Sequence, residues 1–463
     1  MRRTIILTAS LEKITIAFLL LLFVSPAYAQ RVFNYSGVAF RTSYAKTAVV
    51  IARKGGYSGD VVVPAVARYA GTSYRVTTVD SAAFALCPNL RSVVLPSSVT
   101  KIGKCAFQYS TNLQKVVLPD LLTTIPDRAF ECTAIESISI PSKVDSIGKY
   151  AFATTKLKAI PTLARVRRLA QGVFSGCYEM KSFDVPEGIV AIDADAFSSW
   201  QTPTRISVPR SVQYIAPNAF GICPNVVSVE FAPGAQLHSL QRNFFFFSPV
   251  QNFPAVTVPE MVEEVAPNGF VASARQDYLF YNAANCRRTG NGDEFALSAP
   301  LTIFIGKSVE SLPDHVFYTT AANLPRAVVC LDSVPPICCG EPFTPRAYET
   351  VTLYIPKGTR SAFAAAEQWR RFRNVVEFVP AREVVLRSRH VSLQPGDRGY
   401  INAKVSPENA LPFLICTSDN HDTVLPIRAG TIIARSSGSA SVEVKTLDGS
   451  GVATSFSVAV GGL

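Results

Sequence analysis

The stretch Val99–Leu122, VTKIGKCAFQYSTNLQKVVLPDLL, decides the fold of this 463-residue chain. It carries two marks. In the first, an aliphatic residue, Ile102, stands five positions before Phe107. In the second, Leu113-x-x-Val116-x-Leu118 is followed directly by Pro119. Both marks recur along the chain at a nearly constant interval, which is the signature of a repeat protein.

The first mark sets the length of the repeat. Its Phe residues follow one another at intervals of 23, 23, 22, 22, 23 and 23 residues. Three further copies with looser spacing end at Phe245, Phe270 and Phe317. The regular series is Phe84, Phe107, Phe130, Phe152, Phe174, Phe197 and Phe220. We expect a short helix or turn at each Ala-Phe, with the Phe ring in the core.

The second mark, L-x-x-L-x-L, is the strand signature of leucine-rich repeats. Alternate residues of a strand point to opposite faces, so the apolar positions point inward. A Pro directly after the strand cannot donate to the ladder and ends the pairing. The sequence therefore predicts a leucine-rich-repeat solenoid with a continuous parallel β-sheet of short strands. One stretch, 272–299, matches the repeat poorly and is predicted to be a turn-rich excursion.

These repeats resemble the leucine-rich repeats of BspA-type bacterial surface proteins. The entry segment Thr47–Phe84 and the exit segment Leu353–Phe372 are also similar to that family. The resemblance covers roughly residues 35 to 380. It implies a shared fold and a place on the cell surface. Ligands differ among family members, and some members are linked to adhesion to host matrix proteins or to other bacteria.

The composition changes after residue 380, where short alternating runs are separated by turn residues. The pieces VSLQPGD, VSPENA, TSDN and AGTIIARSSGSASVEV resemble the bacterial immunoglobulin-like group 2 domain. This resemblance implies an all-β immunoglobulin-like sandwich that acts as a spacer or adhesion module. The predicted domains are a signal peptide, an N-terminal β cap, the solenoid with its C-terminal cap, and the sandwich, at residues 1–29, 30–77, 78–380 and 381–463.

The first segment has the features of a secretory signal. Arg2 and Arg3 precede the apolar run Ile14–Val24, and Ala27-Tyr28-Ala29 is a small-x-small cleavage site that leaves Gln30 as the first mature residue. The run is shorter than the roughly 20 residues that span a bilayer. We therefore expect an exported protein, secreted or on the cell surface, with a periplasmic location as an alternative, and no transmembrane segment after cleavage.

The composition excludes global disorder, because 48% of the residues are hydrophobic and only 17% are charged. The formal net charge is +11, and removal of the signal segment leaves +9. Spread over a long solenoid, this charge predicts a mild preference for acidic partners or a merely solvated surface. We expect no nucleic-acid partner and a monomer.

The sequence contains no recognisable catalytic or metal site. The four His residues lack the spacing of metal ligands, and neither a nucleophile elbow nor a phosphate-binding loop occurs. The polar tripeptide Asn420-His421-Asp422 falls at a predicted turn. We expect no cofactor, no metal and no enzymatic activity.

Ten Cys residues in an exported chain suggest disulfides. However, successive Cys in the column formed by Cys87, Cys132, Cys177 and Cys223 are two repeats apart. At about 4.8 Å per repeat they are too far apart to bridge. These four are predicted to be buried free thiols, whereas Cys330 could bridge to Cys338 or Cys339.

Extended partners of solenoids commonly bind along the concave sheet. The candidate binding face consists of outward strand residues: Ser92, Lys115, Ser137, Ser139, Ser182, Asp184, Arg205, Ser207, Ser228 and Glu230. The leading hypothesis is a binding or adhesion protein that presents this face to an extracellular protein or glycan. The alternatives are a structural surface or matrix protein without a discrete ligand, and a hydrolase of surface polymers. The run Phe244–Phe247 is either a partner patch or part of a wide coil.

Overall fold

The computed structural model describes residues 30–180, 183–200, 205–221, 223, 228–241, 255–265, 270–272, 277–284, 286–288, 295–297, 300–319, 323–428 and 430–461. The predicted signal segment 1–29, the candidate residue Ser182 and the run Phe244–Phe247 lie outside these residues.

The first described residues form a β cap whose sheet has the strand order β1-β2-β3-β6-β5. One face of this sheet packs into the core through Phe33, Phe40 and Val76, and Tyr57 covers the ring of the first repeat, Phe84, at 4.6 Å between ring centres. The strands are β1 (Val32–Tyr35), β2 (Val38–Ser43), β3 (Thr47–Val50), β5 (Val66–Tyr69) and β6 (Thr72–Val79), with the turn η2 (Tyr44–Lys46).

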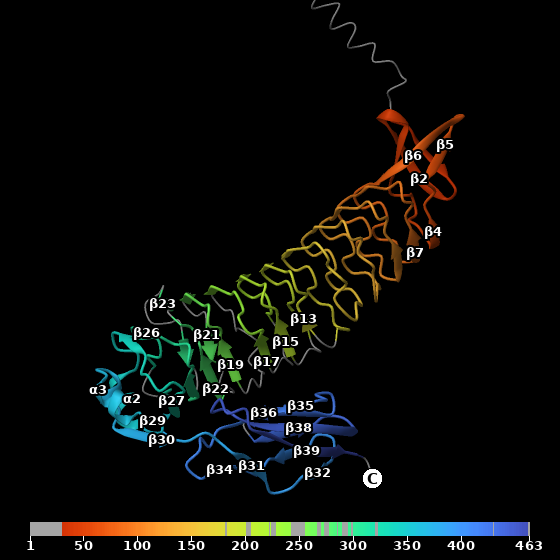
Figure 1. Ribbon diagram of the computed structural model, residues 1–463. Coiled ribbons are helices and arrows are strands. Elements are labelled where there is room, and N and C mark those ends of the chain that lie inside the picture. The colour runs from red at the N-terminus through yellow and green to blue at the C-terminus, as the bar shows by residue number, and fades with distance from the viewer. Residues whose placement is uncertain are drawn as a thin grey trace, which may run out of the picture.

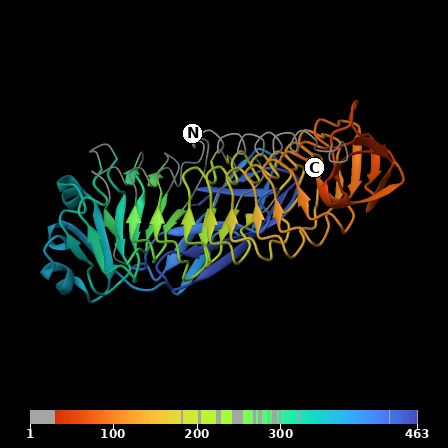
Figure 2. The same ribbon diagram turned by 90° about the horizontal axis from the view of Figure 1, so that it is seen from above.

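Most described coils of the solenoid contribute one strand at the position of the L-x-x-L-x-L signature, and we call the surface built by these strands the strand face (Figures 1 and 2). Inward residues such as Val93 and Val116 are buried, as the period of two requires. The strands are β4 (Gly59–Val62), β7 (Leu90–Val94), β9 (Lys115–Val117), β13 (Phe183–Asp184), β15 (Arg205–Val208), β17 (Ser228–Phe231), β19 (Ala255–Val258), β22 (Tyr278–Tyr281), β25 (Thr302–Ile305) and β27 (Ala327–Cys330).

The aliphatic residue of the first mark lies in a second, shorter strand, which the sequence reading did not anticipate. Within the ladder, Ile125 pairs with Ile147 and Leu169 with Ile192, all in parallel. The short strands are β8 (Lys101–Ile102), β10 (Thr124–Ile125), β11 (Ser146–Ile147), β12 (Arg168–Leu169), β14 (Ala191–Ile192), β16 (Tyr214–Ile215), β18 (Ser239–Leu240), β20 (Glu264–Val265) and β23 (Arg287–Arg288). A coil that carries both strands is thus held to its neighbours on two sides.

The repeated Phe rings stack into a single column, which confirms that they fill the core. Consecutive rings from Phe84 to Phe220 lie 5.2–5.9 Å apart and within 15° of parallel. All seven are at most 2% exposed. The backbone around each ring is a turn and not a helix, so of the two forms expected, the turn is present.

From Phe84 to Phe197, these turns place the residues two positions before and after each Phe at positive φ. In the third coil they are Arg128 (56°) and Cys132 (57°), and their N–H groups donate to Lys149 and Ala153 of the next coil. Gly occupies both positions in one coil, at Gly172 and Gly176. A Cβ atom at Gly172 would lie 2.1 Å from the Tyr150 ring, so this coil requires glycine there for space as well as for φ.

From Phe107 to Phe220, the side chain three positions after each Phe donates a hydrogen bond to a Phe carbonyl. Ser110 Oγ donates to the Phe84 carbonyl at 2.6 Å, and Trp200 Nε1 donates to that of Phe174 at 2.6 Å. The thiols of Cys177 and Cys223 do the same for Phe152 and Phe197, at 3.2 and 3.3 Å. Buried carbonyls need such partners, so these side chains help to hold the column.

The expected continuous sheet is wrong for the strand face. Its described strands form three sheets, ordered β4-β7-β9, β13-β15-β17 and β19-β22-β25-β27-β29-β30, where β29 is Thr352–Pro356 and β30 is Asn374–Phe378. The break after β9 falls at two short coils, where Ile135 and Leu157 follow their Phe by five residues instead of six. Pro161 comes directly after Ile160, which removes two residues from the strand. Residues 135–140 and 157–163 consequently form no strand.

The stretch 272–299 is not an excursion in its described part. It contains β22, which pairs in register with β19 and β25, and β24 (Phe295–Leu297), which pairs with β21 (Phe270–Ala272). The stretch therefore builds one further coil. Its strand, Tyr278–Tyr281, has aromatic residues at outward positions, which hides the expected alternation.

The last coils end in a cap that contains the only α-helices among the described residues. Its core is aromatic: Trp369 packs against Phe343 and Phe372, and its Nε1 donates to the Pro336 carbonyl at 2.8 Å. The elements are β26 (Ser311–Pro313), β28 (Ile337–Cys339), α2 (Pro345–Thr350), β29 (Thr352–Pro356), α3 (Arg360–Ala365), η3 (Trp369–Arg371) and β30 (Asn374–Phe378).

Residues 381–461 form a β-domain with its own core, which includes Val384, Cys416, Val444 and Phe456. It doubles back and lies alongside the solenoid, beneath the strand face (Figures 1 and 2). Its sheets have the orders β32-β39-β38-β35, β33-β37-β36 and β31-β34. The strands are β31 (Glu383–Leu386), β32 (His390–Leu393), β33 (Arg398–Tyr400), β34 (Ala403–Ser406), β35 (Leu414–Ser418), β36 (Val424–Arg428), β37 (Thr431–Ala434), β38 (Gly438–Thr446) and β39 (Ala453–Val460).

Candidate functional site

The outward positions of the strand face from Ser92 to Glu230 form a polar surface, which we call the polar half. At its start Ser92 and Lys115 are paired across β7 and β9. Ser92 Oγ donates to Asp60 Oδ1 at 2.8 Å, and Asp60 also binds Arg91. Lys115 is exposed and is not among the ion pairs of the described residues. The amino-terminal end of the polar half thus offers a cation and hydroxyl groups.

The break after β9 opens a hollow on the polar half. Its volume is about 540 Å³, and its lining includes Lys115, Val117, Ser137 and Ser139. No backbone hydrogen bond joins residues 114–118 to residues 136–140, a part of the chain that the structure describes in full. Unpaired backbone groups and exposed hydroxyls therefore line the hollow, and both can donate to or accept from a polar partner.

A second cluster lies beyond the short coils. Asp184, Ser207 and Glu230 are consecutive in register across β13, β15 and β17. Asp184 and Glu230 are exposed and Ser207 is half-buried. Arg205 and Ser228 are paired by their backbones in β15 and β17. The described candidate residues therefore form two clusters on either side of the two short coils, with Ser137 and Ser139 on the first short coil between them.

The carboxyl-terminal part of the strand face is apolar and covered, a feature that we missed from the sequence. Its outward residues, which we call the apolar half, are Tyr278, Phe280, Phe304, Val329 and Tyr354. They pack against Leu411, Phe413, Ile415 and Leu447 of the β-domain. The sequence contained a sign of this burial, because strands buried on both faces read as nearly continuous apolar runs. IFI at 303–305 and AVVC at Ala327–Cys330 are such runs.

Phe413 is the anchor of this contact between the β-domain and the solenoid. Its ring meets Tyr278, Phe304 and Tyr354 edge-on, with ring centres 6.3, 5.7 and 5.5 Å apart. The Tyr278 hydroxyl donates to the Leu414 carbonyl at 3.0 Å. Burial raises the pKa of the Tyr278 phenol above its ordinary value. The apolar half is therefore occupied by the chain itself.

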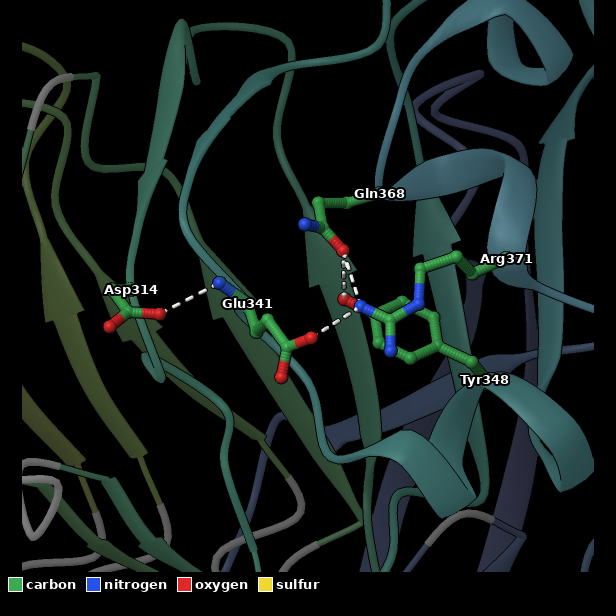
Figure 3. A network of polar contacts seen from close by, with 5 residues as sticks. All are labelled: Asp314, Glu341, Tyr348, Gln368 and Arg371. Carbon is green, nitrogen blue, oxygen red and sulfur yellow. Dashed lines mark hydrogen bonds and ion pairs between the residues drawn. The ribbon is translucent and has the colours of Figure 1, made fainter.

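A polar network at the C-terminal cap has a structural role (Figure 3). The Arg371 guanidinium donates to Glu341 Oε1 at 2.8 Å and to Gln368 Oε1 at 2.7 Å, and it lies 4.3 Å from the centre of the Tyr348 ring. The Glu341 N–H donates to Asp314 Oδ1 at 2.7 Å. These contacts tie α2 and η3 to the last coils. Burial raises the pKa of the Tyr348 phenol, so this group stays protonated.

The buried thiols of Cys177 and Cys223 are unreactive near neutral pH. Burial raises the pKa of Cys177 to about 11 and that of Cys223 to about 12, so neither forms a thiolate near neutral pH. Cys87, Cys177 and Cys223 are buried and unbridged, as expected, whereas Cys132 is half-buried because it lies in the turn beside its Phe.

The remaining predictions about Cys and His concern positions outside the strand face. Cys330 is buried and unbridged, and Cys339 is exposed. Asn420-His421-Asp422 lies in the turn between β35 and β36. Within the described ranges, no three His, Cys, Asp or Glu side chains gather closely enough to hold a metal ion. Among the same residues, no helix has the length and apolar character needed to cross a bilayer.

Comparisons with known proteins concern the repeats. The family model described as BspA type leucine rich repeat region matches in six copies, over residues 72–179, 146–277 and 192–323. No curated protein matches the chain. The chain is similar to a solved leucine-rich repeat protein from Bacteroides ovatus, with 18% identity over 72% of this chain and 96% of that one and a TM-score of 0.43.

Two further solved structures are similar at lower TM-scores. The pneumococcal vaccine antigen PcpA is 14% identical over 75% of this chain and 98% of that one, with a TM-score of 0.37. A leucine rich cell surface protein from Faecalibacterium prausnitzii is 18% identical over 57% of this chain and 96% of that one, with a TM-score of 0.25.

The matched repeats together span residues 72–323, more than half of the chain. They coincide with the coils that carry the Phe column and the strand face. The matched family is one of repeat proteins, and no catalytic family matches. The chain therefore belongs to the BspA-type leucine-rich repeat family.

Proposed function

We propose that this protein is an exported binding or adhesion protein of a bacterial surface, and that it holds an extracellular protein or glycan on the polar half of its strand face. One observation carries the proposal. Equivalent outward positions are apolar and occupied by the β-domain at Phe304, but polar and exposed at Lys115 and Asp184. A surface of mixed charge that the chain leaves open suits a polar partner.

The geometry favours an extended partner over a small molecule. The two polar clusters are separated by the two short coils, and at about 4.8 Å per coil a partner that reaches both must extend over several coils. The hollow beside Lys115 offers hydroxyl and backbone groups between them. The two clusters and the hollow thus offer a series of exposed hydrogen-bonding groups along the polar half.

We also propose the domain organisation that the sequence predicts, and this organisation fits a binding role outside the cell. Residues 1–29 carry the features of a cleaved signal, which would deliver the solenoid outside the cytoplasm. Residues 30–77 would cap the solenoid, residues 78–380 would form the solenoid with its C-terminal cap, and residues 381–463 would be an immunoglobulin-like module that braces it. Membership of the BspA-type family fits a surface location.

Two alternatives have weaker support. A structural matrix protein would need no discrete ligand, and an open polar surface does not require one. A hydrolase would need two carboxyl groups at a closed cleft. Asp184 and Glu230 lie two strands apart, about 9.6 Å, but both are exposed on an open sheet. General acid catalysis depends on a more enclosed carboxyl group.

The test is saturable binding of the full chain to an array of matrix proteins and glycans. The variant Lys115→Ala with Asp184→Asn changes one residue in each cluster. The matched control, Lys149→Ala with Asp195→Asn, makes the same chemical changes in turns beside the Phe column. We expect the first variant to lose about tenfold in affinity, because contacts of this kind contribute about 0.5–1.5 kcal/mol each.

Equal losses of affinity in both variants would show that the polar half is not the binding surface. Absence of saturable binding by the unchanged protein would support the structural alternative. Release of cleaved glycan would support the hydrolase.

A further inference from the structure

The positive charge of the protein is concentrated in the N-terminal β cap. Residues 30–77 contain seven Lys and Arg but one acidic residue, Asp60, so the cap carries +6 of the +9 that remains after the signal segment. By contrast, residues 381–463 contain eight basic and seven acidic residues. The cap is thus a strongly cationic end on an otherwise balanced molecule.

Most of these cations are exposed and unpaired. Asp60 is held by Arg91, and Arg41 is paired with Asp80, each at 2.8 Å. The structure describes the whole of residues 30–77, and no ion pair engages the other six cations there. These exposed residues are Arg31, Lys46, Arg53, Lys54, Arg68 and Arg75.

The sheet register places several of these cations on one face. Val66 pairs with Arg75 and Arg68 with Ser73, so Arg68 and Arg75 are diagonal neighbours on one face of β5 and β6, about 7–8 Å apart. Arg75 pairs with Thr47 of β3, which in turn pairs with Ser43 of β2. Arg41 lies two positions before Ser43 and is therefore on the same face. The opposite face carries the buried residues of the cap core, so this cationic face is the outer one.

Nothing described in the molecule covers this outer face. Figure 1 shows the cap at the end of the solenoid remote from the C-terminal cap, clear of the β-domain. Among the residues paired across this face none is acidic or aromatic, and the nearby Asp80 is bound to Arg41. Its exposed apolar residues are the isolated Val32 (66% exposed) and Val66 (43%).

We propose that the outer face of the N-terminal β cap is a docking surface for an acidic polysaccharide. Cations spread over several strands match anions spread along a polymer, and guanidinium groups bind carboxylate and sulfate groups bidentately. Single-stranded nucleic acid is less well matched, because its bases need aromatic side chains for stacking. An anionic membrane is less well matched, because only two isolated valines are available for insertion.

This surface is distinct from the polar half of the strand face and does not depend on the function proposed there. Its binding should weaken steeply as salt is raised, because exposed charges are screened over about 10 Å at 0.1 M salt. The Lys115→Ala with Asp184→Asn variant should leave it unchanged.

The experiment measures binding of the full chain to dextran sulfate, polygalacturonate and neutral dextran as salt is varied. The test variant is Arg68→Gln with Arg75→Gln, the two cations without an ion pair that the register places on the outer face. The matched control, Lys143→Gln with Lys149→Gln, removes the same charge from exposed residues of the middle coils. Thermal unfolding of each variant checks that the fold is retained.

We expect salt-sensitive binding to both polyanions, little binding to neutral dextran, and a loss of about tenfold or more in the cap variant against less than about threefold in the control. Equal losses in the two variants would overturn the proposal in favour of net charge alone. No binding to either polyanion would overturn it too. So would tighter binding to anionic vesicles or to single-stranded nucleic acid.

Discussion

The two halves of the strand face have the same backbone geometry but opposite surface chemistry. At outward positions the polar half presents Lys115 and Asp184, while the apolar half presents Phe304 and Val329. The inward positions are apolar in both halves, so the repeat core does not differ. The outward residues alone decide whether a coil faces solvent or packs against the β-domain. A repeat scaffold can therefore hold its own domain on one stretch and remain open on another.

The largest expected effect separates the halves by burial. Phe304→Ala should cost about 3–5 kcal/mol, because it removes a fully buried ring between the solenoid and the β-domain. Val117→Ala, at an outward position of the polar half that is 40% exposed, should cost less than about 0.5 kcal/mol. Urea unfolding followed by far-ultraviolet circular dichroism measures both. Similar costs would mean that the apolar half is not covered in solution.

The anchor of the β-domain gives the next effect. Phe413→Ala should weaken docking by about 3 kcal/mol, because three edge-on ring contacts are lost together. We expect faster hydrogen exchange in β22 and β25 and faster protease cleavage near residue 380. Tyr400→Ala, at a side chain of the same domain that is 77% exposed, is the control and should change neither rate.

In the coils that carry the polar half, the stability of the fold should come from the Phe column and not from the outward residues of the strand face. Ser110→Ala should cost about 2 kcal/mol, because it leaves the buried Phe84 carbonyl without its hydrogen bond. Ser137→Ala removes the same hydroxyl group from an exposed position and should cost less than about 0.5 kcal/mol. Thermal unfolding of the two variants compares them. A larger cost at Ser137 would mean that the strand face is structural and not free for a partner.

Exposed ion pairs of these same coils should contribute least. The hydrogen bond from Lys104 lowers the pKa of Asp127, so the folded state favours the ionised carboxyl group. Its contribution is present above the unfolded pKa and is lost as pH falls through the lower folded pKa. Solvent screening limits it to less than about 1 kcal/mol. The difference in stability between the native protein and Asp127→Asn should vanish at acidic pH, and a difference that grew there would contradict this assignment.

Much of the solenoid could be predicted from the sequence because its repeat is regular. The 22- and 23-residue intervals place every Phe from Phe84 to Phe220 in the column. The same intervals hid the break in the strand face, because one deleted residue before Ile135 barely alters the period but shifts the strand. The sequence did not reveal the short strands, such as those that pair Ile125 with Ile147, because a strand of two residues is too short to show an alternating pattern.

The candidate site was predictable only in part. The alternation of inward and outward side chains along a strand placed Lys115 and Asp184 at outward positions, because this alternation depends only on the strand itself. It could not show that the β-domain folds back, because packing between distant segments such as Tyr278 and Phe413 leaves no local pattern. The nearly continuous apolar runs at β25 and β27 indicated strands buried on both faces, but they did not indicate which segment covers them.

The most direct test of the two-half account is hydroxyl-radical footprinting of the intact chain, read residue by residue by mass spectrometry. The account predicts that Tyr278 and Phe304 are protected, while Tyr109 and Tyr400, which are 46% and 77% exposed, are labelled readily. Labelling of Tyr278 and Phe304 at the rate of Tyr400 would contradict it, because the β-domain would then not occupy the strand face.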